Sequence, residues 1–463
     1  MFSKKNAFQG LVFGFILLWG ISCQAASPGN AEQSTAARVG QENPSGPVDP
    51  AISPDRVSVP EAILIQPEDL IYRGFFRLPD RSGSSNWEYS GHGLTFYPGG
   101  DPGGEADGFP GSLFGFGHDH HLLVSEISIP APVITRNLAD APTAATLQPF
   151  ADLTEGIFSA QEMTIPRAGL AYLADPLPRL HFTFGEHFQD FDPSHGWAGI
   201  DLAQPDAHGA WIFGPYSNYV TNDYLFEIPP SWADAIAPGP LLASGRAREG
   251  LWSGRGPALF AYNPPGSETA LDPGGTISGI YPLLLFGEQL LDQPEISSDP
   301  SRAVDHYREA DHWWGGAWLT SDDAAGVVLV GTKGLGEEWY GFANGVVWEH
   351  DCAERQPPTC PEVPEWPYDN RGFWAEDFQA EMIFFDPREL VAVARSELDS
   401  WAPQPYATLI LDEYLLAPEL DLENYKRDLV GAMAFDRDNG LIYLVERLAD
   451  EYKSIIHVWE LIP

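Results

Sequence analysis

Gly93-Leu94-Thr95-Phe96 is the first of five short runs in which a glycine begins an apolar segment that ends at a turn. The other runs are Gly169-Leu170-Ala171-Tyr172, Gly256-Pro257-Ala258-Leu259-Phe260, Gly316-Ala317-Trp318-Leu319 and Gly431-Ala432-Met433-Ala434-Phe435. Further strand-like segments follow most of them. A strand unit that recurs in this way is typical of radial repeats, so the sequence predicts a β-propeller in which each run is the inner strand of one blade.

Three blades can be outlined in the sequence. The first contains 93–98 (GLTFYP), 112–117 (SLFGFG) and 122–130 (LLVSEISIP). The last contains 430–436 (VGAMAFD), 441–446 (LIYLVE) and 455–463 (IIHVWELIP), with a hairpin turn at 437–440. A third blade contains 316–320, 326–331, 381–386 and 406–411. Five blades fit best, and six is the alternative because residues 256–300 do not divide clearly into four strands.

Two further patterns support this architecture. Pro387 and Pro229 each follow a strand-like segment and can begin a short helix, and we interpret both helices as exits from third strands. The last blade lacks an outer strand, and residues 72–79 (YRGFFRLP) can supply it and close the ring. The chain has 46 glycines and 42 prolines, little helical periodicity and no second linker. These features favour one all-β domain over residues 61–463.

The N-terminus predicts export. Lys4 and Lys5 precede an apolar segment, residues 11–21, that is too short to span a bilayer, so residues 1–26 are typical of a signal peptide. The alternative to free secretion is a lipoprotein anchored through Cys23, and this would be the only membrane contact. Residues 27–60 are polar and rich in Ser, Pro and Gly, which predicts a flexible linker. The expected location is periplasmic, cell-surface or extracellular.

Charge narrows the range of partners. The net charge is −41, and it becomes −43 when Lys4 and Lys5 leave with the signal peptide. Such a surface repels nucleic acid and anionic lipid. We expect a monomer whose partner is a glycan or another small molecule. Beyond Cys23, only Cys352 and Cys360 remain, in a Pro-rich loop, and an oxidising compartment favours a disulfide between them.

The chain resembles uncharacterised secreted bacterial β-propeller proteins. The likeness lies in Gly117-His118-Asp119 followed by Glu126-Ile127-Ser128-Ile129-Pro130, and in Gly331-Thr332-Lys333-Gly334 before Trp339-Tyr340-Gly341-Phe342. It would cover most of residues 70–463. The resemblance implies the propeller fold and carries no established activity.

Residues just before the five glycines are the candidates for a site, because the loops that enter the inner strands surround the central channel. They are Tyr89, His92, Glu162, Arg167, Trp252, Arg255, Asp311, His312, Trp313, Trp314, Arg427 and Asp428. Arg167, Arg255 and Arg427 would form a positive mouth for an anionic ligand, and Trp313 and Trp314 would stack on a sugar ring. The alternative is structural: the arginines pair with loop carbonyls and carboxylates, and the tryptophans fill gaps between blades.

Metal sites have weaker support. His118 and His120 are two residues apart and could hold one metal, although a polar loop explains them equally. His187, Asp190, Asp192 and His195 form a looser group. Asp436-x-Asp438-Asn439-Gly440 faintly resembles a calcium loop, without the Glu that such a loop requires, so a tight turn is favoured. The sequence therefore predicts no cofactor, with calcium as the alternative.

The leading functional prediction is recognition of a ligand at the channel mouth, and the expected ligand is a glycan. The competing prediction is a carbohydrate-active enzyme that acts on acidic polysaccharide. A lyase would use His92, His312 and Tyr89 with the arginines, and a glycosidase would use Glu162, Asp311 and Asp428. No nucleophile elbow, phosphate loop or dinucleotide fingerprint is present in the sequence.

Overall fold

The computed structural model describes residues 57–101, 103–159, 166–186, 192–216, 218–247, 253–266, 271–286, 300–349, 351–366, 368–416 and 426–462. The expected signal peptide, Cys23 and nearly all of the expected linker lie outside these ranges. Within them the chain is all-β and forms five sheets arranged as a β-propeller, which confirms the predicted fold and the preferred blade number. No helix among the described residues is long and apolar enough to cross a membrane.

Each blade is built on four antiparallel strands, and the first strands of neighbouring blades contact one another around the central channel. The first blade contains β3 (Leu94–Tyr97), β4 (Ser112–Phe116), β5 (Val124–Ser128) and β6 (Thr146–Ala151). The second contains β7 (Pro166–Leu173), β8 (Arg179–Glu186), β9 (His195–Ala198) and β10 (His208–Trp211). The third contains β11 (Tyr224–Ile228), β12 (Leu241–Arg246), β13 (Ala258–Tyr262) and β14 (Ile280–Leu284).

The last two blades use the N-terminal strands as well. The fourth contains β15 (His312–Ser321), β16 (Ala324–Gly341), β17 (Gly372–Phe385) and β18 (Ala407–Ile410), and the short β1 (Ile63–Leu64) lies parallel to β16. The fifth contains β19 (Val430–Asp436), β20 (Leu441–Asp450), β21 (Lys453–Leu461) and β2 (Leu70–Arg77). Short 3-10 helices occur at Pro67–Asp69, Gly104–Ala106, Leu138–Asp140 and Pro300–Arg302.

The predicted closure of the ring is confirmed. β2 pairs antiparallel with β21, from Leu70 opposite Leu461 to Arg77 opposite Ile455. Phe75 and Phe76 of β2 are 1% and 0% exposed, so the closing strand also contributes to the core. Because β2 covers the edge of β21, the last blade has four strands like the first three.

Glycine is required on the inner strands because neighbouring inner strands approach closely around the channel. A Cβ added to Gly431 would lie 2.5 Å from the carbonyl oxygen of Gly91, which precedes β3. A Cβ on Gly315 would lie 2.9 Å from the carbonyl oxygen of Gly431, and one on Gly93 would lie 3.0 Å from the amide nitrogen of Leu170. These distances leave no room for a side chain, which gives the repeated glycine a physical cause.

The prediction for the third blade is wrong in two respects. The run at Gly256 leads into β13, the third strand of that blade, and a Cβ there would contact Phe286 and Val304. The inner strand is β11, which no glycine precedes; Asn222, with φ of 82°, stands before it. In addition, α1 (Pro230–Ile236) leaves this inner strand, and only α2 (Pro387–Ala394) leaves a third strand.

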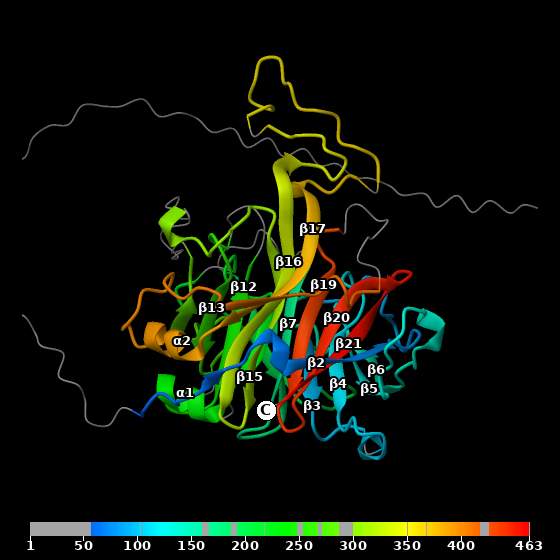
Figure 1. Ribbon diagram of the computed structural model, residues 1–463, viewed down its shortest axis with the longest axis vertical. Helices are drawn as coiled ribbons and strands as arrows, with labels where there is room; N and C mark the ends of the chain where they lie inside the picture. Colours follow the sequence, from blue (N-terminus) through cyan, green and yellow to red (C-terminus); the bar gives the residue numbers. More distant parts are fainter. Residues whose placement is uncertain are drawn as a thin grey trace, which may run out of the picture. The chain divides into compact units, whose positions relative to one another are not determined.

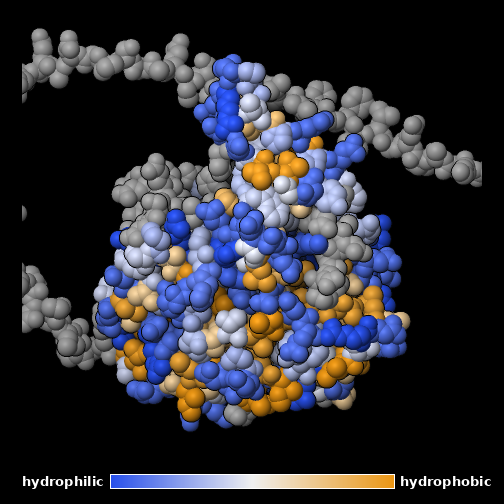
Figure 2. Space-filling model, turned by 45° about the horizontal axis from the view of Figure 1, so that its top comes forward, coloured by the Kyte–Doolittle hydropathy of each residue, from blue (hydrophilic) through white to orange (hydrophobic). Residues whose placement is uncertain are grey.

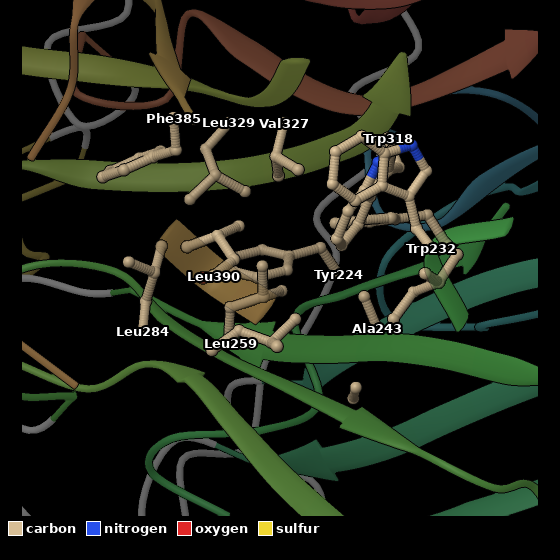
Figure 3. Packing of buried hydrophobic residues seen from close by; sticks show 14 of the residues in the cluster. Tyr224, Trp232, Ala243, Leu259, Leu284, Trp318, Val327, Leu329, Phe385 and Leu390 are labelled. Atoms are coloured by element: carbon tan, nitrogen blue, oxygen red, sulfur yellow. The ribbon is translucent and has the colours of Figure 1, made fainter. Parts of the chain in front are cut away.

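Neighbouring blades pack through apolar side chains, as between the third and fourth (Figure 3). Leu390 of α2 lies between Leu259 of the third blade and Phe385 of the fourth, and all three are fully buried. α2 begins as predicted, with Pro387 in its first turn and the Asp386 side chain accepting a hydrogen bond from the Arg388 amide. The helix therefore seals the outer part of this interface.

The fourth blade carries a projecting arm, residues 335–377, formed by the outer halves of β16 and β17 and their connection (Figure 1). The predicted disulfide between Cys352 and Cys360 is present there. Val347 and Val363 of the arm are each 54% exposed and Trp366 is 62% exposed. Figure 2 shows apolar side chains on one side of the arm among mostly hydrophilic ones.

Candidate functional site

The inner strands begin at one mouth of the channel, here called the entrance, and end at the opposite mouth, the exit. Several of the predicted residues meet at the entrance around the buried indole of Trp314. The ring centroids of His92 and His312 lie 5.1 and 4.2 Å from that of Trp314. The guanidinium carbons of Arg167 and Arg447 lie 4.6 and 4.9 Å from it. Four blades thus supply side chains to one cluster, the entrance cluster.

Carboxylates accompany the arginines of the entrance cluster. Asp223 lies 3.3 Å from Arg167 and 3.7 Å from Arg246. Arg447 lies 3.8 Å from Asp428 and 3.8 Å from Asp119. Charges removed from water need partners of opposite sign, and three arginines here face three aspartates. Each of these three arginines therefore faces a carboxylate, which is the arrangement that the structural alternative predicts for Arg167.

His312 is held by Asp428. Its Nδ1 lies 3.0 Å from Oδ1 of Asp428. Burial raises the pKa of Asp428, but the hydrogen bond from His312 and the nearby positive groups outweigh burial and bring the pKa down to about 2. Asp428 is therefore an ionised acceptor at neutral pH, and Nδ1 of His312 carries the proton that it accepts. The basic lone pair of a neutral His312 is then on Nε2.

Other predicted site residues have different neighbours. Trp313 packs between the third and fourth blades, and Arg427 lies over Trp374 of the arm at 4.6 Å. Arg255 precedes the third strand β13, and its main chain bonds to Phe286 and Val304. These placements give Trp313 a packing position between blades and put Arg427 against the arm.

Tyr89 and Asp311 have different neighbours again. Tyr89 stacks on Tyr452, with ring centroids 5.4 Å apart, and lies 5.5 Å from His118. Asp311 is 2.5 Å from Nζ of Lys333. Burial raises the pKa of Asp311 to about 6, although Lys333 opposes the shift. Glu162, Trp252, His187 and Asp190 lie outside the described residues.

In the part of the chain that the structure describes, no group of three or more metal-ligating side chains occurs, in the histidine loop or elsewhere. Nδ1 of His118 accepts a hydrogen bond from the main-chain N–H of His120 and lies 3.3 Å from a carboxylate oxygen of Asp119. His195 is buried between Ser194 and Ser244. At the turn that resembles a calcium loop, Asp436 instead accepts hydrogen bonds from Asn439.

An open cavity of about 280 Å³ lies at the exit mouth, on the side opposite the entrance cluster. Residues from every inner strand line it, and each blade contributes an aromatic side chain. These are Phe96, Tyr172, Phe226, Trp318 and Phe435. Trp318 is 1% exposed, and its indole nitrogen has no hydrogen-bond partner among the described residues. The wall of this channel cavity therefore carries apolar rings, while the indole nitrogen of Trp318 is itself buried.

Arg437 spans the wall of the channel cavity. It starts in the fifth blade, donates to the carbonyl oxygen of Trp318 at 3.0 Å and to Oγ1 of Thr320 at 2.8 Å, and ends 3.6 Å from Glu227 of the third blade. Burial raises the pKa of Glu227, and Arg437 opposes that shift. Both side chains are partly exposed, so a carboxylate and a guanidinium face the same space as the rings.

Sequence reasoning missed Arg447, Asp223 and Arg246 at the entrance, and Glu227 and Arg437 at the exit. Arg447 and Arg246 lie at the ends of second strands, which our focus on the loops before the glycines left out. Arg437 stands in the 437–440 turn, which was predicted as a turn without any role. No protein-family model matches this sequence, and a search of curated proteins finds no match.

Proposed function

We propose that this protein is an exported recognition module that binds a glycan by taking one sugar unit into the channel cavity. The observation that carries the proposal is the cavity itself, to which all five blades contribute aromatic side chains beside Glu227 and Arg437. Apolar faces of a sugar ring can stack on aromatic side chains, while its hydroxyl groups hydrogen-bond to a carboxylate and a guanidinium. Few convergent polar groups in an apolar pocket are typical of ligand sites.

The exposure of the side chains favours the exit mouth over the entrance as the place where a ligand binds. Trp314, Arg167 and His312 are 3%, 4% and 1% exposed, so a ligand could contact them only if their neighbours moved. Phe435, Tyr172 and Glu227 are half-buried and accessible from the open cavity. At about 280 Å³, the cavity is near the lower end of the range for ligand pockets, which suits a single ring.

Export is the second support for a glycan. The signal-peptide pattern predicts that the chain is exported from the cytoplasm. Outside the cytoplasm, it would meet the polysaccharides of cell surfaces and of the surrounding medium. The disulfide between Cys352 and Cys360 is consistent with an oxidising compartment. Secretion or a lipid anchor at Cys23 would both expose the channel cavity to such ligands.

The test begins with an array of neutral, acidic and amino-group-containing glycans, followed by calorimetric titration of the best ligand. Phe435→Ala and Arg437→Ala are each expected to weaken binding by at least about tenfold, because each removes a contact from the cavity wall. Trp366→Ala and Arg355→Ala are the matched controls, since these residues lie on the arm, and both should bind as the wild type does. Wild-type affinity in both cavity variants, or no glycan binding at all, would overturn the proposal.

The second candidate is a polysaccharide lyase at the entrance, favoured by the hydrogen bond between His312 and Asp428. In that reaction Nε2 of His312 would take the proton from the carbon next to a uronate carboxylate. A carbon–carbon double bond would form as the bond to the leaving oxygen breaks, and that oxygen would receive a proton from a second group such as His92. Arg167 and Arg447 would stabilise the charge that develops on the carboxylate.

This candidate makes its own prediction. If the protein is a lyase, incubation with acidic polysaccharides yields unsaturated products that absorb in the ultraviolet, and His312→Gln slows their release by at least about a hundredfold. His208→Gln is the control, because His208 is exposed on β10 in the second blade. New reducing ends without the unsaturated product would indicate a glycosidase instead. If neither product forms, the recognition module stands alone.

A further inference from the structure

A second, larger cavity of about 610 Å³ lies on the exit side, next to the channel cavity. Its walls come from the turns between β15 and β16 and between β19 and β20, from the start of α1 and from residues 60–62. Pro230, Arg437 and Asp438 line both cavities. These three shared residues form the boundary between the two cavities. We call the larger space the outer cavity.

We propose that the channel cavity and the outer cavity are two neighbouring subsites for one oligosaccharide, and that this oligosaccharide carries positively charged amino groups. The inference rests on the proposed function, since the channel cavity must hold a sugar unit first. One unit occupies the channel, and the next units pass Arg437 and lie in the outer cavity. The ligand is therefore a chain of amino sugars rather than a single sugar.

The charges of the outer cavity support a cationic ligand. Its walls contain five carboxylates and one guanidinium, namely Glu61, Asp322, Asp323, Asp438, Glu460 and Arg437. Arg73 pairs with Glu460, which still leaves an excess of negative charge. Asp322, Asp323 and Asp438 are exposed, so they remain available to an ammonium group. A net charge of −41 on the whole chain attracts the same ligands and repels acidic polysaccharides from this side.

Contacts at the shared wall support a continuous site. Arg437 is fixed by the Trp318 carbonyl and by Thr320, so its guanidinium keeps its position between the two cavities. Glu227 lines the channel cavity alone and Asp438 lines both cavities, so an amino sugar would meet a carboxylate in each subsite.

The experiment is a titration of the full chain with glucosamine and its β-1,4-linked di-, tri- and tetrasaccharides, and with the N-acetylated series as the uncharged match. Affinity is expected to rise at least about tenfold from the monosaccharide to the trisaccharide, and the amino series should bind more tightly than the N-acetylated one at low salt. Ser231→Trp, which fills the outer cavity, and the double variant Asp322→Asn with Asp323→Asn should each remove the gain with length. Neither should change binding of the monosaccharide.

Asp234→Asn is the control for the charge change, because Asp234 is exposed on α1 and does not line the cavity. Equal affinity for one and three units would overturn the outer subsite while the proposed function stands. Equal affinity for the amino and N-acetylated series would overturn the charge preference. If no sugar of any length binds, and Phe435→Ala changes nothing, the proposed function itself fails and the inference fails with it.

Discussion

A chain that begins at residue 78, and so lacks β2 together with the short β1, is expected to lose cooperative folding. The deletion removes the partner of β21 and takes Phe75 and Phe76 out of the core. Truncating one buried phenylalanine costs about 3 to 5 kcal/mol, and a domain has only about 5 to 15 kcal/mol of stability in total. Two lost phenylalanines, about 6 to 10 kcal/mol together, are comparable with that whole stability, and the open strand edge of β21 adds to the loss. Thermal unfolding followed by circular dichroism and tryptophan fluorescence measures the effect.

A chain that begins at residue 61 is the control for this deletion. It keeps both N-terminal strands, and it should unfold at the wild-type temperature. If the chain without β2 also unfolds cooperatively at that temperature, the ring does not depend on its closing strand, and our account of closure is wrong.

The second large effect is expected from Gly431→Ala. The new Cβ would lie 2.5 Å from the carbonyl oxygen of Gly91, and both atoms belong to main chains that the blades hold in place. Inserting even one methyl group where the structure cannot relax costs about 1 to 3 kcal/mol. We expect the upper part of that range, measured as a shift of the urea unfolding midpoint. The variant should fold, because a single methyl group does not exceed the stability of the domain.

Gly103→Ala is the matched control. Gly103 is exposed with φ of −85°, and the nearest atom to its added Cβ is a carboxylate oxygen of Asp101 at 3.2 Å, which can move. Its unfolding midpoint should match that of the wild type. Equal midpoints for Gly431→Ala and Gly103→Ala would show that close approach of inner strands is not the reason for the repeated glycine.

Most of the fold could be predicted because close packing of the inner strands around the channel requires glycine, and the repeated glycines are visible in the sequence. Where inner strands touch, only glycine fits, and the runs at Gly93, Gly169 and Gly431 follow from this. The inner strand of the third blade was predicted wrongly because Asn222, and not a glycine, precedes it. Gly256 precedes a third strand, where a Cβ would contact Phe286 and Val304. A glycine in such a run indicates that another segment approaches closely, but the sequence does not show which segment this is.

The candidate site was less predictable for two physical reasons. Whether Arg167 faces a ligand or a carboxylate depends on Asp223, which a different loop brings within 3.3 Å. The channel cavity depends on side chains at the ends of five separate strands, and each of them, alone, reads as an ordinary core or turn residue. Arg437 shows this most clearly, since the turn that contains it could be predicted but its reach to Glu227 could not.

The central claim is that a sugar unit occupies the channel cavity at the exit mouth. A crystal structure of the protein soaked with its best-binding oligosaccharide tests it most directly. The account predicts density for one sugar ring against Phe435 and Tyr172, with hydroxyl or amino groups within hydrogen-bond distance of Glu227 and Arg437. Density for the sugar at Trp314 and His312 at the entrance, or on the arm, with the channel cavity holding only solvent, would contradict it.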